Sequence, residues 1–85
     1  MGETAMGEAV EPLELDVRED LRAGREPFGR IQAAFGGLRP GQALVLYATF
    51  EPVPLIRLMA GRGYSADVRV LGDGDFAVRF EPQGA

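Results

Sequence analysis

The chain has 85 residues, which is enough for one small domain and too few for two. Hydrophobic residues make up 46% and charged residues 26%, the range of a globular protein, and no stretch approaches the roughly 20 apolar residues that span a bilayer. The chain contains neither cysteine nor histidine. This excludes disulfides, thiol chemistry and the usual zinc, haem and iron–sulfur ligand sets, so we expect no cofactor.

The formal net charge of −4 is unevenly distributed along the chain. Residues 1–12 contain glutamates and no arginine, whereas acids and arginines nearly balance over the rest. A nucleic-acid-binding surface needs a basic stripe, so we expect no nucleic-acid partner. The N-terminus resembles neither a secretory signal nor an arginine-rich transit peptide, and we expect a cytoplasmic protein without membrane association.

A strand is the first predicted element. Residues 1–12 show no hydrophobic period, so we predict a disordered N-terminal tail, a single domain over residues 13–81 and a C-terminal tail over residues 82–85. Within residues 13–18, leucine or valine alternates with charged residues, which predicts a strand with one buried face. Residues 19–25 are predicted to form a polar loop.

A helix is predicted to begin at residues 26–28, because the missing N–H of proline suits a first helical turn. Gly36-Gly37 predicts a left-handed end to this helix, and residues 39–41 predict a turn. Apolar residues at spacings of three and four predict one buried stripe, made of Phe28, Ile31, Phe35 and Leu38.

The run over residues 43–48 is continuously apolar, which is typical of a strand with neighbours on both sides. We therefore predict that it is the central strand of a sheet. Residues 55–60 predict a second short helix with prolines in its first turn, closed by Gly61 and Gly63.

A hairpin is predicted at the end of the domain, since residues 66–70 and 76–81 alternate around a turn at residues 72–74. The element order is then βαβαββ. Its expected arrangement is an α/β two-layer sandwich, a four-stranded mixed sheet with two helices on one face.

The other face of this sheet is left without helices. The central strand must turn one of its alternating sets away from the helices, either Ala43, Val45 and Tyr47 or Leu44 and Leu46. The stems of Arg18, Arg69 and Arg79 would shelter these side chains, or the side chains would form a surface for a partner or a second copy. We favour sheltering, and expect a monomer or a weak homodimer.

The chain resembles the TusA/SirA-like sulfur carriers in four short runs, Leu15-Asp16-Val17-Arg18, Leu21-Arg22, Glu26-Pro27 and Arg39-Pro40-Gly41. The resemblance implies a two-layer fold like that of the initiation-factor C-terminal domain. In those carriers a Cys-Pro-x-Pro motif precedes the first helix, and Gly24-Arg25-Glu26-Pro27 stands there in this chain. Persulfide transfer needs a thiolate, so we reject sulfur carriage.

A closer resemblance is to an uncharacterised bacterial domain family related to these carriers. Its second helix typically opens with Asp-His-Asp-Pro-x-Pro-Leu, and this chain has Thr49-Phe50-Glu51-Pro52-Val53-Pro54-Leu55. Phe50 replaces the histidine, whereas Pro52 and Pro54 are kept. The family includes domains beside or fused to hemerythrin-like domains, which implies an accessory or regulatory role in redox, metal or respiratory metabolism as one alternative.

Two carboxylates in the hairpin turn, Asp73 and Asp75, are close enough in sequence for acid–base catalysis. We favour the alternative that they stabilise the bend. Together with Glu51 they lack the ordered ligand spacing of a calcium loop, so we expect no metal.

The carboxyl ends of the first and central strands predict a site for a small anion, because ligands of open α/β sheets gather there and helix N-termini favour negative charge. In the alternative that we favour, acids in these loops already complement the helix ends and pair with the arginines. The predicted site residues are Arg18, Arg22, Arg25 and Thr49.

No nucleophile, histidine or cysteine is available, so we expect a small non-enzymatic binding or interaction module with a protein partner. The other hypotheses are the accessory role described above and an anion-binding domain that uses the loop from Arg18 to Pro27. The sequence does not identify a ligand.

Overall fold

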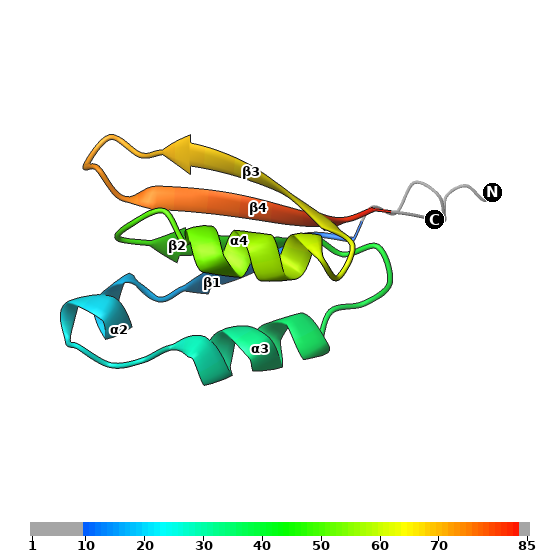
Figure 1. Cartoon of the computed structure of the whole chain (residues 1–85), viewed down its shortest axis with the longest axis horizontal. Helices are drawn as coiled ribbons and strands as arrows, with labels where there is room; N and C mark the ends of the chain where they lie inside the picture. The colour runs from blue at the N-terminus through cyan, green and yellow to red at the C-terminus, as the bar shows by residue number, and fades with distance from the viewer. Residues whose placement is uncertain (1–9, 84–85) are drawn as a thin grey trace.

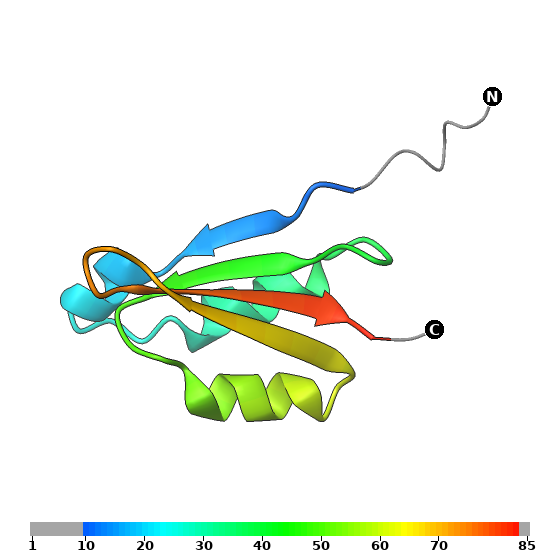
Figure 2. The same cartoon turned by 90° about the horizontal axis from the view of Figure 1, so that it is seen from above.

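The computed structural model describes residues 10–83 and contains four strands and three helices (Figures 1 and 2). The predicted N-terminal tail therefore lies largely outside the described residues. Pro82 belongs to the last strand and not to a C-terminal tail. In chain order the elements are β1 (Leu13–Asp16), α2 (Arg18–Arg22), α3 (Phe28–Gly36), β2 (Leu44–Ala48), α4 (Val53–Ala60), β3 (Tyr64–Val70) and β4 (Phe76–Pro82).

The four strands form one mixed sheet in the order β1-β2-β4-β3. Strand β2 pairs parallel to β1 and antiparallel to β4, so the prediction of a central strand is confirmed. Strands β3 and β4 form the predicted antiparallel hairpin, with Val68 opposite Val78. The α/β sandwich with a four-stranded mixed sheet is thus confirmed.

The core lies between the sheet and helices α3 and α4. In the view of Figure 1, α3 lies below the sheet and α4 lies in front of it. The register brings Leu44 opposite Phe80 and Leu46 opposite Val78, and all four side chains are fully buried. From the helices, the apolar spacing of three and four residues presents Ile31, Phe35, Leu55 and Met59 to this layer.

Two predictions about the first segment are wrong. Strand β1 ends at Asp16, and the predicted polar loop over residues 19–25 begins instead as the five-residue helix α2. The backbone N–H of Leu21 donates to the carbonyl oxygen of Val17, whose side chain is buried. Burial of Val17 and partial burial of Leu21 therefore hold a helical turn in a segment that is otherwise charged.

The beginning and end of α3 also differ from the prediction. Pro27 is the N-cap residue of α3 rather than part of its first turn, and Phe28 is 46% exposed rather than part of the buried stripe. Gly37 has a φ of −97°, so the helix does not end in a left-handed residue. Its N–H donates to the carbonyl oxygens of Ala33 and Ala34, which is an ordinary helical closure.

The predicted sheltering of the open sheet face is confirmed for one arginine. The register turns Leu44 and Leu46 toward the helices and Val45 and Tyr47 away from them. The guanidinium carbon of Arg18 lies 5.4 Å from the centre of the Tyr47 ring, within the range of a cation–π contact. Over residues 10–83, no helix has the length and apolar character needed to cross a membrane.

Candidate functional site

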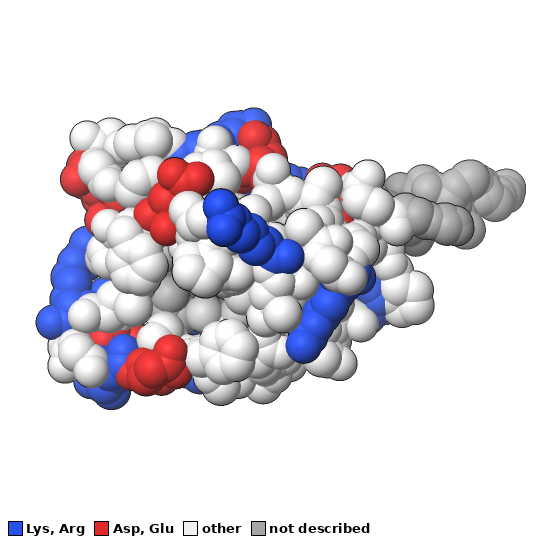
Figure 3. Space-filling model, viewed as in Figure 1, with Lys and Arg blue, Asp and Glu red and all other residues white. Residues whose placement is uncertain are grey.

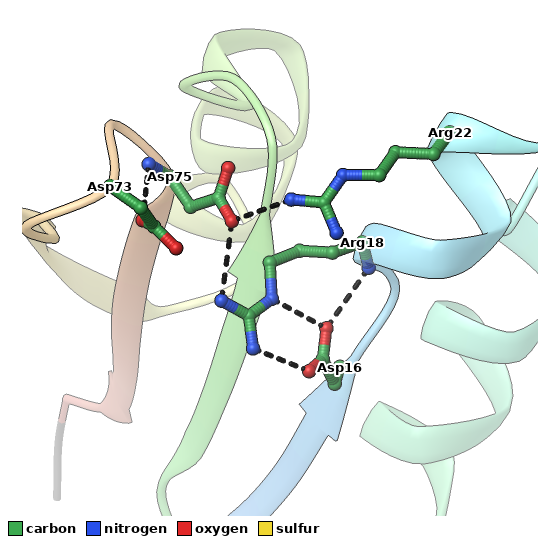
Figure 4. Close-up of polar contacts among 5 residues, drawn as sticks. All are labelled: Asp16, Arg18, Arg22, Asp73 and Asp75. Atoms are coloured by element: carbon green, nitrogen blue, oxygen red, sulfur yellow. Dashed lines mark hydrogen bonds and ion pairs between the residues drawn. The ribbon is translucent and has the colours of Figure 1, made fainter.

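A polar cluster joins the end of β1, helix α2 and the turn between β3 and β4 (Figure 4). We call it the Asp75 cluster, and it consists of Asp16, Arg18, Arg22, Asp73 and Asp75. The Asp75 side chain is only 10% exposed, and its Oδ2 lies 2.8 Å from Nη2 of Arg22 and 3.3 Å from Nη1 of Arg18. Arg18 also binds the Asp16 carboxylate in bidentate fashion, at 2.7 and 3.0 Å.

Contacts within the Asp75 cluster shift the pKa values of Asp16, Arg18 and Asp73. The Arg18 side chain lowers the pKa of Asp16 to about 2 by donating hydrogen bonds to the carboxylate, and the Asp16 carboxylate raises the pKa of Arg18. The pKa of Asp73 is lowered mainly because its carboxylate accepts a hydrogen bond from the backbone N–H of Asp75. All these contacts favour the charged forms, so the cluster is a set of mutually stabilised ions.

The hairpin turn contains the two carboxylates that the sequence offered for acid–base chemistry. The Asp73 side chain accepts the Asp75 N–H at 3.0 Å, and Gly74 has a φ of 90°. This contact is the bend-stabilising role that we favoured for Asp73. Asp75 has a second role that the sequence did not predict, since it binds two arginines that are more than 50 residues away in the chain.

Arg25 belongs to a separate group of ions. Its Nη2 lies 3.0 Å from Oδ1 of Asp20, and Arg30 binds the other oxygen of the same carboxylate. These arginines, Arg25 first, lower the pKa of Asp20. The structure therefore brings Arg18 and Arg22 together, keeps Arg25 with Asp20, and leaves Thr49 outside both groups.

A small anion at this edge would meet arginines that already bind carboxylates. The polar hollow beside Arg18 and Arg22 is also lined by two acids, Asp16 and Glu19. A new anion would have to compete with Asp75 for the same guanidinium groups. The anion site remains a prediction. Among residues 10–83, no group of three acidic side chains is placed to hold a metal ion.

A second feature is an apolar cavity of about 320 Å³ between α3 and α4, which we call the apolar groove. Figure 3 shows the uncharged surface over the two helices, with a hollow between them and acidic side chains on either side of it. Its lining comes from five segments of the chain: Val17, Leu21, Glu26, Pro27, Phe28, Ile31, Leu46, Ala48, Phe50, Pro52, Pro54, Leu55 and Leu58.

The apolar groove has a buried floor and an exposed rim. Leu46 and Ala48 of β2 form part of the floor and are at most 2% exposed. By contrast Phe28 is 46% exposed, Phe50 52% and Leu58 36%. The rim thus presents large apolar side chains to solvent around a hollow that continues into the core.

Residues of the two degenerate motifs converge at the groove. Pro27 and Pro52 are buried N-cap residues of α3 and α4, and their carbonyl oxygens accept the N–H groups of Ile31 and Ile56 at 3.0 Å. Each proline follows a glutamate, so two Glu-Pro pairs start the two helices that form the walls. The motif residues that line the groove are Glu26, Pro27, Phe50, Pro52 and Pro54.

The position of the missing cysteine is not part of the groove lining. Gly24 has a φ of 78°, a conformation that favours glycine, although a Cβ there would meet no atom within 4 Å. Gly24 therefore fits the backbone turn between α2 and α3. Arg25 and Glu51 are likewise absent from the lining, although both adjoin residues that belong to it.

Sequence reasoning missed the groove because its members belong to different elements. Leu21 was hidden in a segment predicted as loop, and Leu58 lies on an exposed flank of α4. One signal was available, since Phe50 and Phe28 each stand beside a Glu-Pro pair at a helix start. Chemically the lining offers dispersion contacts and one carboxylate, Glu26, and no arginine.

Comparison with known proteins places the chain in a family. The model of a family described as "Uncharacterized conserved protein (DUF2249)" matches residues 14–82. The chain belongs to this family. No curated protein and no solved structure matches the chain. The match covers every strand and helix of the DUF2249 domain except the first residue of β1, Leu13. The expected relationship to TusA/SirA-like sulfur carriers remains a prediction.

Proposed function

We propose that this DUF2249 domain is a non-enzymatic interaction module whose apolar groove takes the apolar side chains of a protein segment. The observation that carries the proposal is the exposed apolar rim around the groove, formed by Phe28, Phe50 and Leu58. Large exposed apolar side chains that surround a hollow are typical of a binding surface, whereas isolated ones are ordinary.

The free energy for such binding would come from the rim. Burying one large apolar side chain contributes about 1.5–3 kcal/mol, before the entropy of association is subtracted. Aromatic side chains next to a pocket are common anchors of interfaces because they bury much area with few rotatable bonds. Two phenylalanines at the rim therefore support a segment with one or two apolar anchors of its own.

The lining of the groove also favours binding over catalysis. Glu26 is its one ionisable side chain, and its Oε1 accepts the backbone N–H of Phe28 at 2.7 Å. Acid–base catalysis needs a positioned group that can move a proton at the reacting atom, commonly with a partner of different pKa. A single carboxylate engaged at a helix start supports a structural or recognition role.

The other hypotheses remain predictions. An accessory or regulatory role in redox, metal or respiratory metabolism is compatible with an interaction module. Anion binding at the loop from Arg18 to Pro27 would require release of Asp75 or Asp20 from their arginines. The groove is the stronger basis for a function, because its exposed apolar side chains form no ion pairs that a ligand would have to displace within residues 10–83.

The test uses a neutral probe, N-acetyl-phenylalanyl-leucinamide, titrated into the protein while backbone amide signals are followed by NMR. We expect the signals of α3, α4 and the segment around Phe50 to shift together. Leu58→Gln should weaken binding severalfold, because Leu58 is 36% exposed and burying that remaining surface contributes about 0.5–1 kcal/mol.

Leu13→Gln is the matched control for this variant. Leu13 is 37% exposed against 36% for Leu58, and it is not part of the groove lining. The control should bind the probe as the unchanged protein does. Equal weakening in both variants, or shifts scattered over the sheet, would refute the assignment of the groove.

A further inference from the structure

The end of the apolar groove at which α3 and α4 begin is acidic. We infer that the partner segment carries a lysine or arginine next to its apolar anchors. This inference rests on the proposed function and adds the chemistry of the partner. It follows from the positions of Glu26 and Glu51, the glutamates of the two Glu-Pro pairs that start α3 and α4.

Glu26 is both a groove residue and a helix-capping residue. Its Oε1 accepts the Phe28 N–H, while its second oxygen accepts no hydrogen bond within residues 10–83. The carboxylate therefore keeps a free acceptor beside the apolar lining. Glu26 is exposed, so a cation at this oxygen would form a surface ion pair of modest strength.

Glu51 lies between two groove residues, Phe50 and Pro52. The Glu51 side chain is exposed and forms neither an ion pair nor a side-chain hydrogen bond with any described residue. Five other acids of the described residues pair with arginine, namely Asp16, Asp20, Asp67, Asp75 and Glu81, and four others, Glu11, Glu14, Glu19 and Asp73, form no such pair. Glu26 and Glu51 therefore belong to the acids that pair with no arginine among residues 10–83, and they are the two that stand at the groove.

The apolar rim supports the same choice of partner. A lysine or arginine lays its aliphatic stem along apolar surface while its charge stays in water. The rings of Phe28 and Phe50 offer such a surface beside the two carboxylates. An acidic partner would meet like charge at this end, and an uncharged one would leave the two carboxylates unmatched.

Two other occupants fit the charge pattern less well. Residues 1–9 of the chain contain Glu3 and Glu8 and no arginine, so they would bring like charge to the acidic end. The described chain also enters β1 at the end of that strand farther from α2, away from the two Glu-Pro pairs (Figure 2). A second copy would bring arginines that mostly bind carboxylates of their own domain.

The experiment compares three capped peptides that share the Phe-Leu anchors of the neutral probe and end in arginine, glutamine or glutamate. Dissociation constants are measured by NMR at low and high salt. We expect the arginine peptide to bind about two- to fivefold more tightly than the glutamine peptide at low salt, as for an exposed ion pair, and the glutamate peptide to bind most weakly. The differences should shrink at high salt.

Variants that remove charge show which carboxylates cause the preference for the arginine peptide. The double variant Glu26→Gln, Glu51→Gln should bind the arginine and glutamine peptides equally, and the new glutamine at position 26 keeps an oxygen for the Phe28 N–H. The control is Glu14→Gln, Glu81→Gln, which makes the same change of net charge on exposed acids outside the groove lining. It should keep the preference for arginine.

The outcomes separate this inference from the proposed function. Binding of all three peptides with equal affinity, or an arginine preference that persists in the double variant, would overturn the inference and leave the groove intact. Failure of every peptide, including the neutral probe, would overturn the proposed function as well. Affinity that rises when the protein is diluted would assign the groove to a second copy and would also overturn the inference.

Discussion

The Asp75 cluster and the apolar groove lie at the same end of the domain and differ in how their groups are satisfied. In the cluster, a nearly buried carboxylate binds Arg18 and Arg22, and Arg18 binds Asp16 in addition. In the groove, Phe28 and Phe50 remain about half exposed beside a hollow that the domain itself does not fill.

This difference separates a structural role from the binding role that we propose. Two of the three arginines that the sequence offered as ligand groups, Arg18 and Arg22, bind Asp75 of the hairpin turn, and Arg25 binds Asp20. The prolines and the phenylalanine of the second motif, which looked like remnants of lost chemistry, instead form an unfilled apolar surface. The satisfaction of a residue's contacts therefore distinguishes the two regions better than its chemistry alone does.

The largest expected effect is on the floor of the groove. Leu46→Ala should lower the free energy of unfolding by about 2–5 kcal/mol, because Leu46 is 1% exposed and its removal leaves a cavity in the core. Urea unfolding followed by circular dichroism measures the change. A loss below about 1 kcal/mol would mean that the floor is not part of the core.

The Asp75 cluster should show a smaller effect on stability. Asp75→Ala removes the acceptor of two guanidinium groups, and we expect a loss of about 1–2 kcal/mol because both arginines remain partly exposed to water. Asp67→Ala is the control, since Asp67 forms an exposed ion pair with Arg69 and should change stability by less than about 0.5 kcal/mol. Equal losses in the two variants would remove the special role of Asp75.

The rim of the groove should matter little for stability. Phe50 is 52% exposed, so Phe50→Ala should change the free energy of unfolding by less than about 1 kcal/mol while weakening the neutral probe severalfold. Val70→Ala, at a 68% exposed residue outside the groove lining, should leave the affinity unchanged. If Phe50→Ala unfolded the domain, its ring would be a core group rather than a rim group.

The smallest expected effect is the pH dependence of Asp16. Its pKa is about 2 in the folded state against an ordinary 3.8, so its contribution to stability is present above about pH 4 and is lost as the pH falls toward 2. NMR titration of the Asp16 carboxyl carbon should give the low midpoint. In Arg18→Gln the midpoint should return toward 3.8, and an unchanged midpoint would assign the shift to another cause.

The sequence predicted the architecture because its main signals are local. Alternation in β4, the apolar run of β2 and the three-and-four spacing of α3 each follow from the contacts of one element with the core, whereas β1 has no buried residue. Helix α2 was missed because its residues are mostly charged, and its turn depends on burial of Val17 by other segments.

The candidate site was less predictable, because it depends on contacts between segments that are far apart in the sequence. Asp75 meets Arg18 and Arg22 only because the order β1-β2-β4-β3 brings the end of the hairpin turn to the end of β1. The groove likewise depends on the distance between α3 and α4, which no local pattern encodes. The Glu-Pro pairs were visible in the sequence, but their shared position was not.

The most direct measurement of the central claim is a map of intermolecular nuclear Overhauser effects between the arginine peptide and the methyl groups of the protein. We expect contacts from the peptide's phenylalanine and leucine to Ile31, Leu55 and Leu58, which line the groove. Contacts to Val45 on the open face of the sheet, with none to these three residues, would contradict the account.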